Sequence, residues 1–586
     1  MHLLSTRPGG HVEDGGQGVV RVAQTPAQVV VLSAADTTLG LLAEAVRELG
    51  PDYPSVRLAN LMWLRQPASV DLYVEDVLRQ ARVVVIDHLG APSDWAYVVE
   101  RAMSLARERG QWLAMFSGES SEDQQLLLRS TAPEHECRQL WRYLREGGAD
   151  NARGFFALIG QAAFGLGTRP PPPAPLSSTL PYSAPGLSAP AGAQAPAVLL
   201  VFYRAHVQAG NTAVFDAMLG ALTSAGMHAL ALAVDSLKNP ASLAAVQTLC
   251  RQQGVSVVLN ATHFALAQQD PQGSQSQALG GDAVVLQLIT AGREREQWEV
   301  DPHGLAPRDL AMQVVLPEID GRVLTRAISF KGVSWRCERT ELDVVRYQPE
   351  PERMAFVAEL ARRWCLLRDK PNAAKRIGLV LANYPVDDSR IANGVGLDTL
   401  ASTVDVLHAL RGAGYATGDA LPEHGDELVA RLLRGVTNDS ACNPSRPALQ
   451  SLSLADYRDW FEQLPRANRD AVERQWGGPE DDPALRNGRF PITGLRLGGV
   501  FVGIQPARVR ELADVSATYH DAEMAPPHHY LAFYAWLRRV FRVDALVHVG
   551  THGNLEWLPG KSVALSAQCW PDAVLGPLPH VYPFIV

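Results

Sequence analysis

Short apolar runs, rich in valine and leucine, alternate with longer stretches of helical periodicity along most of this 586-residue chain. Uninterrupted apolar runs of four to eight residues are typical of strands buried on both faces, and alternation with helices favours a parallel sheet covered by helices. In the first part of the chain the predicted strands are Val29–Leu32, Val83–Ile86 and Trp112–Phe116. The predicted helices there are Thr38–Leu49, Val70–Gln80, Asp94–Arg109, Glu134–Glu146 and Asn151–Phe164.

The same alternation restarts twice, which predicts a multi-domain α/β protein built of several Rossmann-like or flavodoxin-like units. Between 170 and 196, nine of 27 residues are proline, so this stretch is expected to be an extended, mobile linker. We therefore expect an α/β domain over 1–168, a linker over 169–196, a second α/β domain over 197–345 and a third α/β region over 346–586. The later predicted strands are Ala197–Phe202, His228–Val234, Val255–Asn260, Val284–Ile289, Arg376–Ala382 and Ala545–Val549, and the later helices are Asn211–Ala225, Ser242–Gln253, Ser402–Leu410 and Tyr530–Phe541.

Composition excludes several classes of function. A formal net charge of −9 without a concentrated basic stripe argues against a nucleic-acid-binding protein. No apolar run approaches the roughly 20 residues of a membrane helix, and residues 1–10 lack the layout of a signal peptide, so a cytoplasmic protein without a membrane partner is expected. The six cysteines form no Cys-x-x-Cys pair, which disfavours zinc-finger and iron–sulfur sites.

A histidine-rich block near the end of the sequence is the strongest candidate for chemistry. His548, His552 and Glu556 are spaced by four, but Gly550 and Gly553 argue against one continuous helix. We expect His548 to end a strand and the other two to lie in the following loop, where ligands of parallel sheets bind. Imidazole and carboxylate suit a divalent metal such as Co²⁺ or Zn²⁺, while core histidines and a helix-capping glutamate remain the alternative.

The Gly560-Lys561-Ser562 tripeptide ends like a phosphate-binding loop but does not form one. Six residues separate Gly553 from Gly560, and they include Trp557, Leu558 and Pro559, which cannot build the required cradle of backbone amides. Any ATP that the reaction needs is therefore expected to be hydrolysed by another chain.

Two further segments place polar residues after predicted strands, where an anionic ligand could bind. A plain structural loop explains the first segment equally well, and helix capping explains Asn211 and Thr212 in the second. The candidates are Arg390, Asn393 and Asp398 in the first, and Arg204, His206 and Asn211 in the second.

Several long segments of the sequence resemble the large subunit of cobaltochelatases, which are relatives of the magnesium chelatases. They include FYRAHVQAGNT (202–212), KPNAAKRIGLVLANYPVDDSRIANGVGLDTLAST (370–403), PPHHYLAFYAWLRRVF (526–541) and HVGTHGNLEWLPGK (548–561). The form GNLEWLPGK is similar to the cobalt type rather than the magnesium type. Family members are roughly twice as long, so the chain resembles their N-terminal half.

The resemblance implies a reaction and a set of roles. It implies insertion of the substrate metal Co²⁺ into hydrogenobyrinic acid a,c-diamide, in a complex whose AAA+ subunit uses ATP and Mg²⁺ and whose third subunit carries a metal-adhesion domain. Glu556 would accept the ring protons, and His548 and His552 would deliver the metal, these three being the expected metal ligands. Residues expected to bind the tetrapyrrole are Arg204, His206, Asn211, Arg390, Asn393, Asp398, Lys561 and, in preference to His529, His528. The alternatives are a magnesium chelatase subunit and a non-catalytic tetrapyrrole-binding scaffold.

Overall fold

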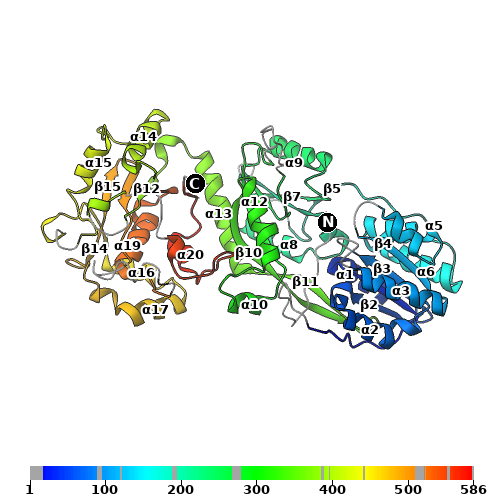
Figure 1. The fold of residues 1–586 in the computed structure, drawn as a ribbon. Coiled ribbons are helices and arrows are strands. Elements are labelled where there is room, and N and C mark those ends of the chain that lie inside the picture. Colours follow the sequence, from blue (N-terminus) through cyan, green and yellow to red (C-terminus); the bar gives the residue numbers. More distant parts are fainter. Residues whose placement is uncertain are drawn as a thin grey trace. The chain divides into compact units, whose positions relative to one another are not determined.

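The chain divides into two compact units in the computed structural model (Figure 1). Unit 1 comprises Met1–Asp301 with Leu305–Met354, and unit 2 comprises Pro302–Gly304 with Ala355–Val586. The structure describes residues 18–88, 95–118, 122–187, 195–266, 279–383, 388–392, 394, 396–439, 443–508, 521, 523–550 and 555–583. Each unit is described by itself.

Unit 1 begins with a four-stranded parallel sheet. In spatial order its strands are β2 (Val56–Asn60), β1 (Val29–Ser33), β3 (Val83–His88) and β4 (Trp112–Ser117). Its helices are α1 (Asp36–Glu48), α2 (Pro67–Asp76), α3 (Ala96–Arg109), α4 (Gln124–Arg129), α5 (Glu134–Glu146) and α6 (Ala149–Phe164).

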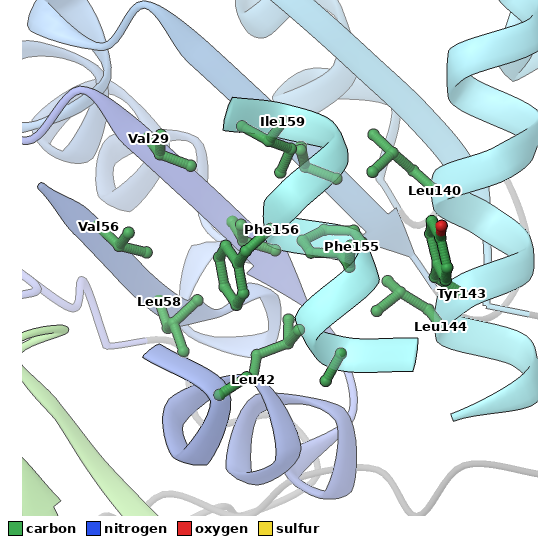
Figure 2. Packing of buried hydrophobic residues seen from close by; sticks show 14 of the residues in the cluster. Val29, Leu42, Val56, Leu58, Leu140, Tyr143, Leu144, Phe155, Phe156 and Ile159 are labelled. Carbon is green, nitrogen blue, oxygen red and sulfur yellow. The ribbon is translucent and has the colours of Figure 1, made fainter. Parts of the chain in front are cut away.

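Alternating residues of strand β1 bury against helices on opposite faces of this sheet, as the period of two in a strand requires. Val29 and Val31 belong to a core that contains residues of α1, α5 and α6, whereas Val30 and Leu32 belong to a core that contains residues of α2 and α3. In Figure 2, Phe155 and Phe156 of α6 lie among side chains from the strands and from α5. The expected helix-covered parallel sheet is confirmed here.

The second sheet of unit 1 has seven strands, five of which run parallel. In spatial order they are β11 (Leu342–Pro349), β10 (Val323–Cys337), β9 (Val284–Ala291), β8 (Val257–Asn260), β6 (Ala197–Tyr203), β7 (His228–Val234) and β5 (Thr179–Tyr182). The accompanying helices are α7 (Arg204–Gln208), α8 (Ala213–Ser224), α9 (Pro240–Gln253), α10 (Arg295–Val300), α11 (Pro307–Leu310) and α12 (Leu316–Ile319).

The proline-rich segment expected to be an extended, mobile linker contributes a strand to this sheet. β5 pairs antiparallel with β7 at the sheet edge. Pro181 is tolerated there because an edge strand can leave one side of its backbone unpaired. The hairpin of β10 and β11 also reaches the first sheet, since Cys337, Leu342 and Val344 join the core of α1, α5 and α6. The two sheets therefore form one unit, a coarser division than separate domains over 1–168 and 197–345.

Unit 2 is built on a five-stranded sheet in which only the edge strand β15 runs antiparallel. The order is β15 (Gly494–Leu497), β16 (Val500–Ile504), β12 (Ile377–Leu381), β17 (Ala545–Val549) and β18 (His580–Val581), and a separate pair consists of β13 (Gln450–Ser453) and β14 (Arg489–Ile492). The helices are α13 (Pro351–Asp369, which crosses the boundary between the units), α14 (Thr399–Gly412), α15 (Gly425–Leu432), α16 (Leu454–Phe461), α17 (Arg466–Trp476), α19 (His528–Trp536) and α20 (Trp570–Leu575).

Helices again cover both faces of this sheet. Val380 and Leu546 pack into a core with residues of α16, α17, α19 and α20, while Leu379 and Leu381 pack with residues of α14 and α15. Because β16, β12, β17 and β18 are parallel, their carboxyl ends share one edge, and the polar residues that follow them are brought together there. None of the helices in the described part of the chain combines the length and hydropathy that a membrane crossing requires.

Candidate functional site

The carboxyl edge of the unit 2 sheet carries a cluster of buried polar side chains. His548 is the penultimate residue of β17, Gln505 directly follows β16, and His580 begins β18. Tyr534 reaches the cluster from α19. His548 therefore lies one residue before the end of its strand, where the sequence analysis expected it to be the last residue. The register of the parallel strands explains why residues far apart in sequence meet.

Both ring nitrogens of His548 have partners within this cluster. Nδ1 lies 2.7 Å from Nε2 of His580, and Nε2 lies 3.2 Å from Oε1 of Gln505 and 3.1 Å from the hydroxyl of Tyr534. The Tyr534 hydroxyl donates to Oε1 of Gln505 at 3.0 Å, and Nε2 of Gln505 donates to the hydroxyl of Tyr530 at 3.1 Å.

These contacts assign the tautomers of the histidine pair. Burial, with a smaller contribution from neighbouring His580, lowers the pKa of His548 well below its usual value, and burial lowers the pKa of His580 to about 4. Both rings are therefore neutral at pH 7. Because the amide oxygen of Gln505 can only accept, Nε2 of His548 carries the hydrogen, and its Nδ1 accepts from Nε2 of His580. Nδ1 of His580 then carries a lone pair.

Glu556 and His580 line one cavity of about 430 Å³, together with Leu555, Leu565, Pro571, Asp572, Leu575 and Tyr582. Glu556 is the middle residue of a short 3-10 turn, Leu555–Trp557. The turn buries Leu555 and leaves Glu556 exposed. Its charge still acts on Tyr534 and contributes to the raised pKa of that phenol, for which burial is the main cause.

Two contacts hold the segment that carries Glu556. Arg508, fully buried after β16, donates to the backbone carbonyl of Trp557 at 2.8 Å and to that of Met524 at 3.2 Å. Beyond the turn, the backbone amide of Lys561 lies 3.5 Å from Sγ of Cys569. At Gly560, φ is +156° and a Cβ atom would lie 2.9 Å from Cβ of Cys569, so only glycine fits this approach.

Of the three expected metal ligands, the structure describes His548 and Glu556. His552 lies outside the described residues, as does Asn393. Within the described ranges, no group of three or more His, Cys, Asp or Glu side chains has the arrangement of a metal site. Both nitrogens of His548 contact protein groups, and His580 lines the cavity together with Glu556.

His528 lies in the hydrophobic core of unit 2 instead of lining this cavity. Its Nδ1 is 2.8 Å from the hydroxyl of Tyr457, its Nε2 is 3.0 Å from the carbonyl of Gly477, and its ring packs edge-on against Phe461. The neighbouring ring of His529 is also held, with Nδ1 3.1 Å from a carboxylate oxygen of Asp482. These contacts give both residues structural roles.

The first candidate segment contains one helix cap. Asp398 is the N-cap residue of α14, and its carboxylate accepts from the backbone amide of Ala401 at 2.9 Å. Arg390 is exposed at the end of the short 3-10 turn Asp388–Arg390. The structural interpretation of Asp398, a cap that satisfies a helix amide, accounts for its position.

The candidates of the second segment lie in unit 1 and have local partners. Arg204 donates to the carbonyl of Leu176 at 2.9 Å, so it anchors the start of the proline-rich segment. His206 is buried 4.8 Å from the ring of Phe215, and burial lowers its pKa to about 3. Asn211 is buried, and Thr212, the N-cap residue of α8, forms no side-chain cap. The predicted Asn/Thr cap is wrong because the Thr212 hydroxyl instead donates to Asp216 at 3.0 Å.

Sequence reasoning did not single out His580, Gln505, Tyr534 or Arg508. A signal existed for Gln505, which is the first polar residue after the apolar run Val500–Ile504. His580 begins a strand of only two residues, which no periodicity could indicate.

Comparisons with known proteins agree on one family. Residues 141–586 match the family model described as CobN/Magnesium Chelatase. The whole chain is 50% identical to "Aerobic cobaltochelatase subunit CobN" of Pseudomonas aeruginosa and 42% identical to the protein of that name from Sinorhizobium sp, covering 47% and 46% of their lengths. Over 65% of the chain it is 29% identical to a magnesium-chelatase subunit of Rhodobacter capsulatus, covering 32% of that protein.

A solved structure gives the same result. The "Catalytic Subunit of Cobaltochelatase from Mycobacterium tuberculosis" matches with a TM-score of 0.69 and 33% identity, over 95% of this chain and 46% of that one. The chain thus spans about half the length of the relatives named cobaltochelatase that it matches. From the family model and from both full-chain matches, the chain belongs to the CobN/magnesium chelatase family.

Proposed function

We propose that this chain is part of the large subunit of a cobaltochelatase, which inserts Co²⁺ into hydrogenobyrinic acid a,c-diamide during aerobic cobalamin synthesis. The observation that carries the proposal is the 50% identity to a cobaltochelatase subunit over the whole chain, against 27–29% over about two thirds of the chain for magnesium-chelatase subunits. The Co²⁺ ion is a substrate of this reaction.

Metal insertion requires that the ring N–H groups lose their protons to a base within hydrogen-bond reach. We propose that Glu556 accepts these protons at the cavity that it shares with His580. Its exposure supports this role, because an exposed carboxylate at the cavity wall is accessible to a bound macrocycle.

The neutral histidine pair suits a site that a divalent cation must approach. Two imidazolium groups would repel Co²⁺, whereas burial keeps His548 and His580 uncharged at pH 7. In this proposal Nδ1 of His580 offers a lone pair to the incoming metal or to a ring proton, and His548 is a positioning residue that fixes the tautomer of His580. The contribution of His552 as a third ligand remains part of the proposal.

The partners follow from the same proposal. The chain would act with an AAA+ subunit that hydrolyses ATP with Mg²⁺ and with a subunit that carries a metal-adhesion domain, in the cytoplasm. Lys561 and Arg390 would contact peripheral acid groups of the macrocycle, for which cationic side chains are the usual partners. The absence of a phosphate-binding loop around Lys561 supports the division of labour.

The test is an insertion assay with the large subunit that contains this sequence, the two partner subunits, ATP and Co²⁺. We expect ATP-dependent disappearance of the metal-free corrinoid and no insertion of Mg²⁺ into protoporphyrin IX. Insertion of Mg²⁺ into protoporphyrin IX would contradict the proposal, and binding of the corrinoid without any turnover would identify a scaffold instead.

A further inference from the structure

Unit 2 contains a second cavity, of about 830 Å³, at the sheet edge opposite to the candidate site. Arg376 directly precedes β12 and Asp544 directly precedes β17, so the cavity lies at the amino ends of the parallel strands, whereas His548 lies near their carboxyl ends. The remaining lining residues are Arg363, Lys370, Ala374, Arg538, Arg539, Arg542 and Val543. The proposed reaction uses none of them.

The lining carries six cationic side chains and one carboxylate, in a chain whose formal net charge is −9. Lys370 pairs with that carboxylate, Asp544, at 2.7 Å, and Arg363 pairs with Glu359 at 2.8 Å. The other four are arginines that form no ion pair with a carboxylate in the described part of the chain, namely Arg376, Arg538, Arg539 and Arg542.

Arg538 lies close to other positively charged side chains of this lining. Among the described residues, its guanidinium donates to backbone carbonyls alone, those of Ala573 at 3.3 Å and Val574 at 3.2 Å. It lies where a Cβ atom on Gly576 would approach its Nη2 to 2.5 Å, so the glycine makes room for it. Burial, and then the like charges of Arg363 and Arg539, lower its pKa to about 10. An anion in the cavity would relieve this repulsion.

The arginines at 538, 539 and 542 lie on backbone segments of uncommon conformation. Arg538 and Arg539 lie in a π-helical turn, Leu537–Phe541, and Arg542 follows it with a left-handed φ of +54°. Such turns are rare, as is a positive φ for a residue with a long side chain, and both occur preferentially at functional sites. Arg542 is exposed, and its backbone amide donates to the carbonyl of Leu537, while its guanidinium has no hydrogen-bond partner within the described residues.

We propose that this cavity binds an oligophosphate group, either as a free inorganic anion or as the polyphosphate of a nucleotide. Guanidinium groups bind phosphate oxygens in bidentate fashion, and four uncompensated cations match the three to four negative charges of a di- or triphosphate better than those of a monoanion. The inference goes beyond the proposed reaction and does not depend on it, because the site lies at the other edge of the sheet.

The test is calorimetric titration of the purified chain with inorganic tripolyphosphate, ATP without metal, and sulfate. We expect saturable binding of tripolyphosphate that is at least tenfold tighter than that of sulfate and weakens as salt is raised. ATP that binds as tightly as tripolyphosphate would identify the phosphates alone as the ligand. ATP that binds more tightly would identify a nucleotide, and either result supports the site.

The variant for this test is the double substitution Arg539→Gln/Arg542→Gln, which changes exposed side chains and should leave the fold intact. Its affinity for tripolyphosphate should fall by at least tenfold. The control is Arg466→Gln, an exposed arginine of α17 outside the cavity, which should bind as the unchanged chain does.

Three results would overturn the inference. They are the absence of saturable tripolyphosphate binding, equal binding by the double variant and the control, and equal affinity for sulfate and tripolyphosphate. Binding of polyglutamate but not of tripolyphosphate would likewise overturn it and would identify an acidic protein segment as the occupant.

Discussion

Nδ1 of His548 and Nε2 of His580 lie 2.7 Å apart, which joins two parallel strands of unit 2 through a pair of imidazoles. Because Gln505 and Tyr534 hold the other nitrogen of His548, the pair has a defined direction. The hydrogen of His580 points at His548, and the lone pair of His580 is left on Nδ1. A strand-end histidine thereby controls the chemistry of a second histidine 32 residues later in the chain.

Replacement of Glu556 by Gln should abolish cobalt insertion and leave tetrapyrrole affinity within about twofold. The amide keeps the size of the side chain but cannot accept a ring proton at neutral pH. Since Glu556 is exposed, its loss should not change the thermal unfolding midpoint. The measurements are the insertion rate in the assembled complex and corrinoid binding. Glu523→Gln, an exposed glutamate of the same unit, is the matched control, and substantial insertion by the Glu556→Gln complex would remove this residue from the mechanism.

The histidine pair should make the chain less stable in acid. An unfolded histidine has a pKa near 6.5, and burial lowers that of folded His580 to about 4, so the unfolded chain binds the proton more readily. The stability that the neutral ring provides is complete above about pH 6.5 and is lost as the pH falls toward about 4. Burial also lowers the pKa values of His206, to about 3, and of partly buried His263, to about 4, so both should act in the same direction.

His580→Gln isolates the contribution of one ring to this pH dependence. The amide can still donate to Nδ1 of His548 but does not titrate, so the unfolding midpoint should change less between pH 6.5 and 4.5 than in the unchanged chain. Calorimetric unfolding across this range measures the difference, with exposed His424→Gln as the control. Insertion should also slow by at least about tenfold, the lower end of what a lost metal partner or its supporting contact costs. An unchanged pH profile together with an unchanged insertion rate would contradict the assigned tautomer and role.

Arg508 should be required to hold the turn that carries Glu556. Arg508→Gln removes donors from the carbonyls of Trp557 and Met524 inside the protein, and it should lower the stability of unit 2 by about 3 kcal/mol. Insertion per folded molecule should fall as well, because Glu556 loses its support. Urea unfolding and the insertion rate test the two effects separately. A variant as active and as stable as the original chain would show that the turn carrying Glu556 does not depend on Arg508.

His528→Phe should affect stability without affecting the reaction. The ring of His528 accepts from Tyr457 and donates to the carbonyl of Gly477, so phenylalanine leaves two buried groups unpaired at a cost of about 2–4 kcal/mol. Corrinoid affinity, measured at a temperature where the variant is folded, should stay within about twofold. A large loss of corrinoid affinity in the folded variant would contradict this and show that His528 contacts the tetrapyrrole.

Several strands were predictable because strands that are buried on both faces consist almost entirely of apolar residues. β1, β3, β7 and β17 lie within one or two residues of their predicted ends, since strands covered on both faces are nearly continuous apolar runs. β2 escaped prediction because Arg57 interrupts its apolar pattern. This buried arginine pairs with Glu341 at 2.7 Å and donates to the carbonyls of Thr25 and Val56 at 2.9 and 2.8 Å. β5 escaped because it lies in a proline-rich segment, where composition favours a linker.

The sequence pointed to single residues of the candidate site but not to the partners that they meet in space. His548 and Glu556 stood out by their spacing. Glu556 lines the cavity, whereas His548 contacts His580, which lines it too. The partners of His548 could not be inferred, because their meeting depends on which strands are neighbours in the sheet. The sequence gives no sign that His528 is buried in the core of unit 2, because a core histidine looks the same in sequence as one that faces a substrate.

The measurement that tests the central claim most directly is a fluorescence titration of this chain with hydrogenobyrinic acid a,c-diamide, with protoporphyrin IX in parallel. The account predicts saturable binding of the corrinoid and none of the porphyrin. Preferential binding of protoporphyrin IX, or binding of neither compound, would contradict the assignment of a cobalt-chelatase tetrapyrrole site to these residues.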